Sequence, residues 1–164
     1  MERNVGDSSV GQPVIKGYLT GVFDLFHIGH LNIIKNARDR CDYLIVGVTT
    51  DELCTTEKGK EPIIGFEERI EIISSLRYVD QVVPQSSYDK MQAWKAYSFH
   101  RIFVGDDWKG SERWNKLEQQ FQSVGVDIVY FPYTKSTSST KIRKIINSFN
   151  FDAEAVHETN RNHQ

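Results

Sequence analysis

Two histidines in one short turn are the residues best suited to do chemistry. His27 and His30 lie between an apolar run that ends at Leu19 and a helical pattern that begins at Leu31. A turn from a strand into a helix offers unpaired backbone N–H groups and the positive end of the helix dipole, which favour bound phosphate. Two imidazoles joined by a small Ile-Gly link can point into one cavity. The spacing predicts a phosphate-binding turn, and the alternative is a pair that only satisfies local backbone groups.

Three further polar segments follow apolar runs in the same way. They are Lys58-Gly59-Lys60, Gly105–Gly110 and Ser136–Thr140. Each has a plain alternative, since the lysines suit a solvated loop, aspartates suit turns and the hydroxyls suit a helix cap. Taken together with the histidines, these groups predict a site that holds a polyphosphate and stabilises charge during displacement at phosphorus.

The elements that must position these groups alternate along the chain. Strands are predicted over 14–19, 43–49, 81–84, 101–104 and 127–131, and helices over 31–40, 66–76, 88–97, 114–124 and 140–149, with a loop over 50–65. Alternation of this kind predicts an α/β protein: one Rossmann-like, doubly wound domain with a five-stranded parallel sheet and helices on both faces. Ligands bind beyond the carboxyl ends of such strands, so the polar segments are expected on one edge. We expect residues 14–150 to form this domain, 1–13 a loose arm and 151–164 a polar tail.

Composition narrows the classes of protein. The 164 residues suit one domain, and a net charge of −2 argues against a general nucleic-acid binder. The sequence contains no apolar run of membrane-span length, and residues 1–12 lack the apolar core of a signal peptide. Cys41 and Cys54 lack the spacing of a zinc site or a disulfide framework, which favours reduced thiols in a cytoplasmic protein. The sequence also lacks G-x-G-x-x-G, G-x-x-x-x-G-K-[ST] and G-x-S-x-G, which disfavours dinucleotide redox, P-loop and nucleophile-elbow chemistry.

Several motifs in order resemble one enzyme family. His27-Ile28-Gly29-His30 resembles the H-x-G-H signature of nucleotidyltransferases that join a nucleoside triphosphate to a phosphorylated small molecule. This chain also resembles the cytidylyltransferase branch of that family, in the segments 50–52, 58–60, 68–69, 77–80 and 105–108. That branch has a small single-domain member that uses glycerol 3-phosphate. The resemblance runs from about residue 16 to about residue 146.

The resemblance implies a reaction and a set of site residues. A phosphate oxygen of a phosphorylated alcohol, with glycerol 3-phosphate as the default, attacks the α-phosphorus of CTP and pyrophosphate leaves. Mg²⁺ accompanies the triphosphate, and no protein side chain is assigned to hold it. The implied catalytic residues are His27, His30 and Lys58; the nucleotide-binding residues are Gly21, Phe23, Asp24, Gly29, Lys60, Asp106, Trp108, Ser138, Ser139 and Thr140; Arg69 and Asp51 are assigned to the substrate. The resemblance also implies a homodimer through Arg77–Asp80. For Arg69 the sequence equally allows a simple ion pair with an acid on its own helix.

The last motif departs from the family pattern. Where the family has Arg-Thr-Glu-Gly-Ile-Ser-Thr-Thr, this chain has Tyr133 in place of the arginine, Lys135 in place of the acid and Ser136 in place of the glycine. Lys135, Lys141 or Arg143 could supply the missing charge. Two alternatives stay open: an adenylyltransferase of the same fold, because phosphate-binding groups do not name the base, and a nucleotide-binding regulatory domain.

Overall fold

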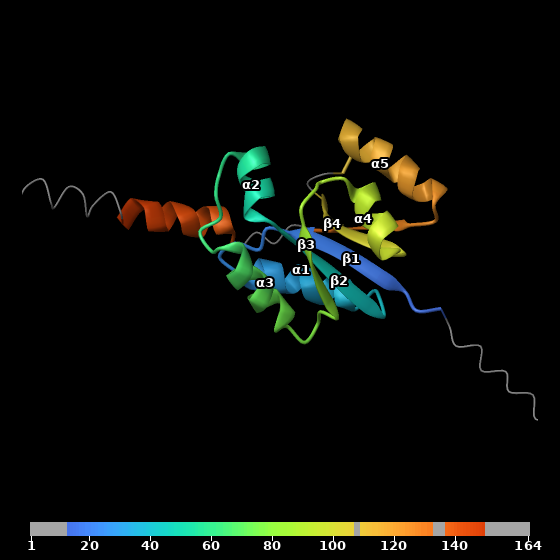
Figure 1. Ribbon diagram of the computed structural model, residues 1–164, viewed down its shortest axis with the longest axis horizontal. Coiled ribbons are helices and arrows are strands. Elements are labelled where there is room, and N and C mark those ends of the chain that lie inside the picture. Colours follow the sequence, from blue (N-terminus) through green and yellow to red (C-terminus); the bar gives the residue numbers. More distant parts are fainter. Residues whose placement is uncertain (1–12, 107–108, 133–136, 150–164) are drawn as a thin grey trace, which may run out of the picture.

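Five parallel strands form the centre of the molecule. The computed structural model describes residues 13–106, 109–132 and 137–149, without the side chains of Lys58 and Arg113. The elements are β1 (Lys16–Gly21), α1 (Ile28–Arg38), β2 (Tyr43–Thr49), α2 (Asp51–Lys58), α3 (Phe66–Ser74), β3 (Gln81–Gln85), α4 (Lys90–Tyr97), β4 (Arg101–Gly105), α5 (Glu112–Ser123) and β5 (Asp127–Phe131) (Figure 1). A last helix, unlabelled and orange-red in Figure 1, covers residues 139–149 and projects from the body.

The sheet confirms the predicted fold class. The strand order is β3-β2-β1-β4-β5, and all four neighbouring pairs are parallel. The chain winds outward from β1 to one edge, returns, and winds outward to the other edge. The point at which the winding reverses lies between β1 and β4, and in open α/β sheets this is where ligands bind.

Both faces of the sheet are buried, because residues along each strand alternate between two apolar cores. Leu19, Val46 and Phe103 pack with α1 and α3 on one face. Tyr18 and Ile102 share the other face with α4 and α5. A strand covered on both sides must be apolar at nearly every position, which explains the continuous run from Tyr43 to Thr49.

The structure corrects one prediction about secondary structure. Residues 51–58 form α2, where a loop was expected. Thr50 caps this helix by accepting a hydrogen bond from the Leu53 amide, and Asp51 and Glu52 occupy its first turn. Gly59, at φ 62°, ends it. The sequence contains these capping residues, but so short a helix has only a weak apolar pattern, and the pattern alone did not predict a helix here.

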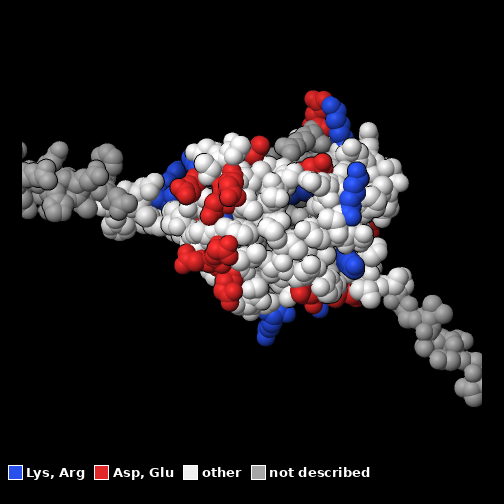
Figure 2. Space-filling view, viewed as in Figure 1, with Lys and Arg blue, Asp and Glu red and all other residues white. Residues whose placement is uncertain are grey.

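Charge is unevenly distributed over the surface. Acidic side chains gather over α2 and α3 on the face shown in Figure 2, and Asp51, Glu52, Glu67 and Glu68 belong to the first turns of these helices. Such a face repels a phosphate backbone. Within the described ranges, no helix is long and apolar enough to cross a bilayer. The predicted arm, apart from residue 13, and the predicted tail lie outside the described residues.

Candidate active site

The turn after β1 is held in an unusual backbone conformation. Phe23 and Leu25 have positive φ values of 56° and 50°, which residues other than glycine rarely adopt. Asp24, between them, is 4% exposed, and its carboxylate accepts hydrogen bonds from the amides of Ile63 and Ile64 at 2.9–3.1 Å. It also forms an ion pair with Arg143 at 2.6 Å. The turn is therefore fixed by two segments far away in the sequence.

These contacts define the role of Asp24. Burial alone would raise its pKa, but the amides of Ile64 and Ile63 and the Arg143 guanidinium outweigh burial and lower the pKa below the ordinary value. Its two carboxylate oxygens are taken by protein donors. In this structure Asp24 therefore holds the turn to the segment at Ile63 and Ile64 and to Arg143, and so acts as a positioning residue.

The two histidine rings lie against each other at the start of α1. Their centroids are 3.9 Å apart and their planes differ by 26°. His27 is the N-cap residue, and its Nδ1 accepts a hydrogen bond from the Gly29 amide at 3.0 Å. In a neutral ring this assignment puts the proton on Nε2, which is then available as a donor. A Cβ on Gly29 would lie 2.8 Å from Cε1 of His27, so a glycine is required for this packing.

The second ring sits deeper. His30 packs against the rings of Phe23 and Phe26, with centroids 5.4 Å and 5.6 Å away. Its Nδ1 is buried, and no atom of the described residues hydrogen-bonds to it. Burial, helped by His27 and opposed by Asp24, lowers the pKa of His30 to about 4. Burial also lowers the pKa of His27. Both rings are therefore neutral near pH 7 and can donate hydrogen bonds to phosphate oxygens without being protonated.

The N-terminus of the helix over 139–149 meets this turn. Ser139 Oγ donates to the backbone oxygen of Asp24 at 2.7 Å, and Ser138 Oγ accepts from the Lys141 amide at 3.2 Å. The structure thus brings the two predicted serines to the histidine turn across more than 100 residues of sequence, while Thr140 is exposed in the first helical turn. In this structure the Ser139 hydroxyl docks the helix on the turn and the Ser138 hydroxyl caps the helix, while their assignment to the nucleotide stays a prediction.

Arg69 is buried next to the histidine turn, and its guanidinium is engaged by protein groups. It is 1% exposed. Its guanidinium donates to the backbone oxygens of Ile64, Val22 and Thr49 at 2.5–2.8 Å, and it forms an ion pair with Asp51 at 2.6 Å. The assignment of Arg69 to the substrate stays a prediction. The structure shows its guanidinium engaged by backbone oxygens that only the fold supplies, and paired with Asp51 of α2 instead of an acid on its own helix.

Asp51 has the same structural character. Its second carboxylate oxygen accepts from the Phe66 amide at 3.0 Å and so caps α3, whose own N-cap residue, Gly65, has no side chain. Arg69 and Asp51 together tie the ends of β1 and β2 to the loop that precedes α3.

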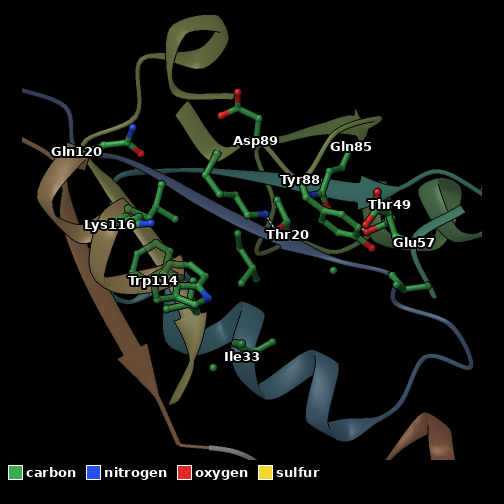
Figure 3. Close-up of a pocket in the computed structure, with 18 of the residues that line it drawn as sticks. Thr20, Ile33, Thr49, Glu57, Gln85, Tyr88, Asp89, Trp114, Lys116 and Gln120 are labelled. Carbon is green, nitrogen blue, oxygen red and sulfur yellow. Dashed lines mark hydrogen bonds between the residues drawn. The ribbon is translucent and has the colours of Figure 1, made fainter. Parts of the chain in front are cut away.

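A cavity of about 1140 Å³ opens at the same edge of the sheet. In Figure 3, Thr20 of β1 lies near its middle, with Thr49, Gln85, Tyr88 and Glu57 toward one end and Trp114, Lys116 and Gln120 of α5 toward the other. Lys90, which also lines the cavity, donates from Nζ to Thr20 Oγ1 at 2.6 Å. Sequence reasoning missed Thr49 and Gln85, although they are the last residues of β2 and β3, where the carboxyl-edge rule would have found them.

The remaining predicted residues fall into three groups. Gly21 lines the cavity, whereas Phe23 is 4% exposed and supports the ring of His30. Lys60 and Asp106 are exposed after α2 and β4. The Lys58 side chain and residues 107–108 and 133–136, which include Trp108, Tyr133, Lys135 and Ser136, lie outside the description.

The part of the chain that the structure describes holds no group of three or more His, Cys, Asp or Glu side chains that could bind a metal ion. Asp24, the acid nearest to the histidines in sequence, has both oxygens engaged by protein donors. This donor set does not form a protein cage for Mg²⁺. It fits a metal ion that arrives on the phosphates of a ligand, since Mg²⁺ is often held largely by substrate phosphates and water.

The sequence of this chain matches a known family of proteins. A family model described as cytidylyltransferase-like matches residues 18–145. Glycerol-3-phosphate cytidylyltransferase of Bacillus subtilis is 35% identical over 127 residues, which cover 77% of this chain and 92% of that protein. FAD synthase of Pyrococcus abyssi is 33% identical over 139 residues, which cover 83% of this chain and 93% of that protein.

A solved structure is also similar. The lipopolysaccharide core biosynthesis protein of Thermoplasma volcanium has a TM-score of 0.63 and 28% sequence identity, covering 76% of this chain and all of that one. The match spans most of both chains, so the similarity extends over most of the fold. The chain therefore belongs to the cytidylyltransferase-like family and is a nucleotidyltransferase.

Proposed function

We propose that the protein transfers a cytidylyl group from CTP to a phosphorylated small alcohol, with glycerol 3-phosphate as the default acceptor. The observation that supports this most strongly is the neutral, stacked pair His27 and His30 at the switch point of the sheet. The pair lies beside the N-terminus of the helix over 139–149. The similarity to glycerol-3-phosphate cytidylyltransferase over 92% of that protein supports CTP and this acceptor.

In the proposed reaction, an oxygen of the acceptor phosphate forms a bond to the α-phosphorus of CTP. The bond from that phosphorus to the bridging oxygen breaks, and pyrophosphate leaves with the electron pair. Negative charge grows on the nonbridging and leaving oxygens. Nε2–H of His27 donates toward these oxygens, His30 lies against it, and Lys58 and Lys60 supply positive charge. Mg²⁺, carried on the triphosphate, neutralises phosphate charge when bound. Preorganised donors of this kind each contribute about 10²–10³-fold in rate.

An adenylyl transfer is the second candidate. FAD synthase of Pyrococcus abyssi matches at 33% identity over 93% of its length, nearly as well as the cytidylyltransferase. The phosphate-binding turn serves either nucleotide, because it does not contact the base. The base is expected to lie beyond β4, near Asp106 and Trp108.

Pyrophosphate release tests both candidates. CTP and ATP are each combined with glycerol 3-phosphate, phosphoethanolamine and flavin mononucleotide. We expect release with CTP and a phosphorylated alcohol. Release only with ATP and flavin mononucleotide would replace the first candidate by the second, and release with no pair would favour a regulatory nucleotide-binding domain.

Replacement of a histidine tests the site itself. We expect His30→Ala to lower turnover by roughly 10²–10⁴-fold with the fold intact. Ile28→Ala is the matched control, since Ile28 belongs to the same turn but is 49% exposed. Equal turnover in the two variants would contradict the assignment.

We further propose a homodimer through Arg77–Asp80 in the cytoplasm. Arg77 is exposed and donates to the Tyr78 hydroxyl at 2.7 Å, whereas Asp80 is engaged within the chain by the Leu44 amide and Arg38. Light scattering of the wild type and of Arg77→Glu tests the interface: a dimer that the substitution leaves intact would contradict it.

A further inference from the structure

A polar pair lies at one end of the cavity, where the adjoining core is apolar. Thr49 is 1% exposed and Gln85 is 4% exposed. Thr49 Oγ1 donates to Gln85 Oε1 at 2.9 Å, and Gln85 Nε2 donates to the Ser87 backbone oxygen at 3.2 Å. On the same face of the sheet, Ile45 and Val83 precede them in β2 and β3 and pack into the core. Packing alone would be served as well by apolar residues at both positions.

The pair has hydrogen-bonding capacity left over. An amide offers two N–H donors and two lone pairs, and a hydroxyl accepts as well as donates. Within the described residues, Gln85 uses one amide donor and one lone pair, and Thr49 uses its hydroxyl proton. One N–H of Gln85 and oxygen lone pairs on both residues remain, in side chains that line the cavity. Buried polar groups normally find partners, so a ligand group with hydroxyls would complete this pair.

The strand order assigns this end of the cavity to one substrate. Thr49 and Gln85 end β2 and β3, on one side of β1, whereas β4 and Gly105 lie on its other side. Thr20, one residue before the end of β1, lies between the two ends (Figure 3) and accepts a hydrogen bond from Lys90. The histidine turn follows β1, so the reacting phosphates lie near the middle. If the nucleoside lies beyond β4, the acceptor occupies the side of β2 and β3.

We propose that Thr49 and Gln85 select the acceptor by hydrogen-bonding a hydroxyl of a small polyol phosphate. This inference rests on the proposed function, which it deepens by naming the acceptor class and the residues that recognise it. An acceptor without such a hydroxyl leaves the pair's remaining donor and lone pairs unpaired and out of water. Sites built to bind a substrate hydroxyl therefore discriminate strongly against analogues that lack it.

The test compares two acceptors in three proteins. The acceptors are glycerol 3-phosphate and propyl phosphate, which has the same carbon chain without hydroxyls. The proteins are the wild type, the double variant Thr49→Val with Gln85→Met, and Gln81→Met. Replacing both partners by apolar groups of similar shape leaves stability nearly unchanged, which keeps the fold. Gln81 is the matched control, because it lies on β3 and on the same sheet face but is exposed at the far end of the strand.

We expect the wild type to prefer glycerol 3-phosphate by roughly 10–100-fold in kcat/KM, as for one buried hydrogen bond to a hydroxyl. In the double variant the preference should fall to near unity while the KM for CTP is unchanged, and Gln81→Met should behave as the wild type. Calorimetric binding of both acceptors and of inorganic phosphate gives the same comparison without turnover.

The outcomes separate the two proposals. Absence of pyrophosphate release with every nucleotide and acceptor contradicts the proposed function, and calorimetry still decides the selection of acceptors. A wild type that binds propyl phosphate as tightly as glycerol 3-phosphate overturns the inference. So does a double variant that keeps the wild-type preference.

Discussion

Acidification should destabilise the protein through His30. The ring is neutral when folded because burial lowers its pKa to about 4, whereas the unfolded ring titrates near the ordinary value of 6.5. Between these two pH values the unfolded chain binds a proton that the folded chain does not, so stability falls as the pH falls. The full difference corresponds to about 3 kcal/mol. Over the experimentally convenient step from about pH 7.5 to about pH 5, the expected loss is about 2 kcal/mol.

Urea unfolding at the two pH values measures this loss in the wild type and in His30→Gln, whose amide does not titrate. The wild type should lose about 2 kcal/mol more than the variant over this step. His27→Gln is an informative partner, because His27 helps to lower the pKa of His30 and its removal should reduce the wild-type loss. A titration of the folded protein by NMR reports the ring directly. Equal losses in wild type and His30→Gln, or a His30 midpoint near 6.5, would refute the reasoning.

Three further predictions concern the groups that hold the site. Arg69→Met should lower the free energy of unfolding by about 3–5 kcal/mol, because it leaves three carbonyl oxygens and the Asp51 carboxylate without a fully buried donor; Arg101→Met, at a half-buried arginine, should cost under about 1 kcal/mol by the same urea assay. Gly29→Ala should displace the capping imidazole and lower turnover while the far-ultraviolet circular dichroism stays unchanged; full activity would show that the ring position is unimportant. Asp24→Asn should release the helix over 139–149, measured as faster amide hydrogen exchange there, and unchanged exchange would contradict the role of this ion pair.

The predicted elements that the structure confirms are those with a strong local signal. β2 and β5 have the predicted bounds. The apolar run of each strand ends abruptly at polar or turn residues, and such a change of polarity marks where a buried strand ends. The helix over 51–58 was missed, because capping by Thr50 carries more of its signal than apolar periodicity does. Short helices depend on such caps, and a periodicity argument overlooks them.

For the site residues, the sequence predicted the positions of some but not the contacts of others. The types and spacing of His27 and His30 were sufficient to predict that the two rings lie together at a turn from a strand into a helix, since the strand, the glycine-containing turn and the helix are all local. Residue type did not reveal the roles of Asp24 and Arg69. Both carry charges that suit a ligand, but the partners that define their roles lie far away in the sequence. Asp24 is held by Ile64 and Arg143, which are 40 and 119 residues away. Arg69 is held by Val22 and Thr49, which are 47 and 20 residues away.

The sequence by itself determined most of the order of strands and helices, the position of the histidine turn and, through its motifs, the family. These follow from patterns within about ten residues, where propensity, polarity and spacing act directly. Only the tertiary structure decided which charged groups face a ligand and which hold the turn. It alone placed Thr49 and Gln85, the ends of two separate strands, side by side at one end of the cavity. Burial and partners are properties of the packed chain, because they depend on which distant segments the fold brings together.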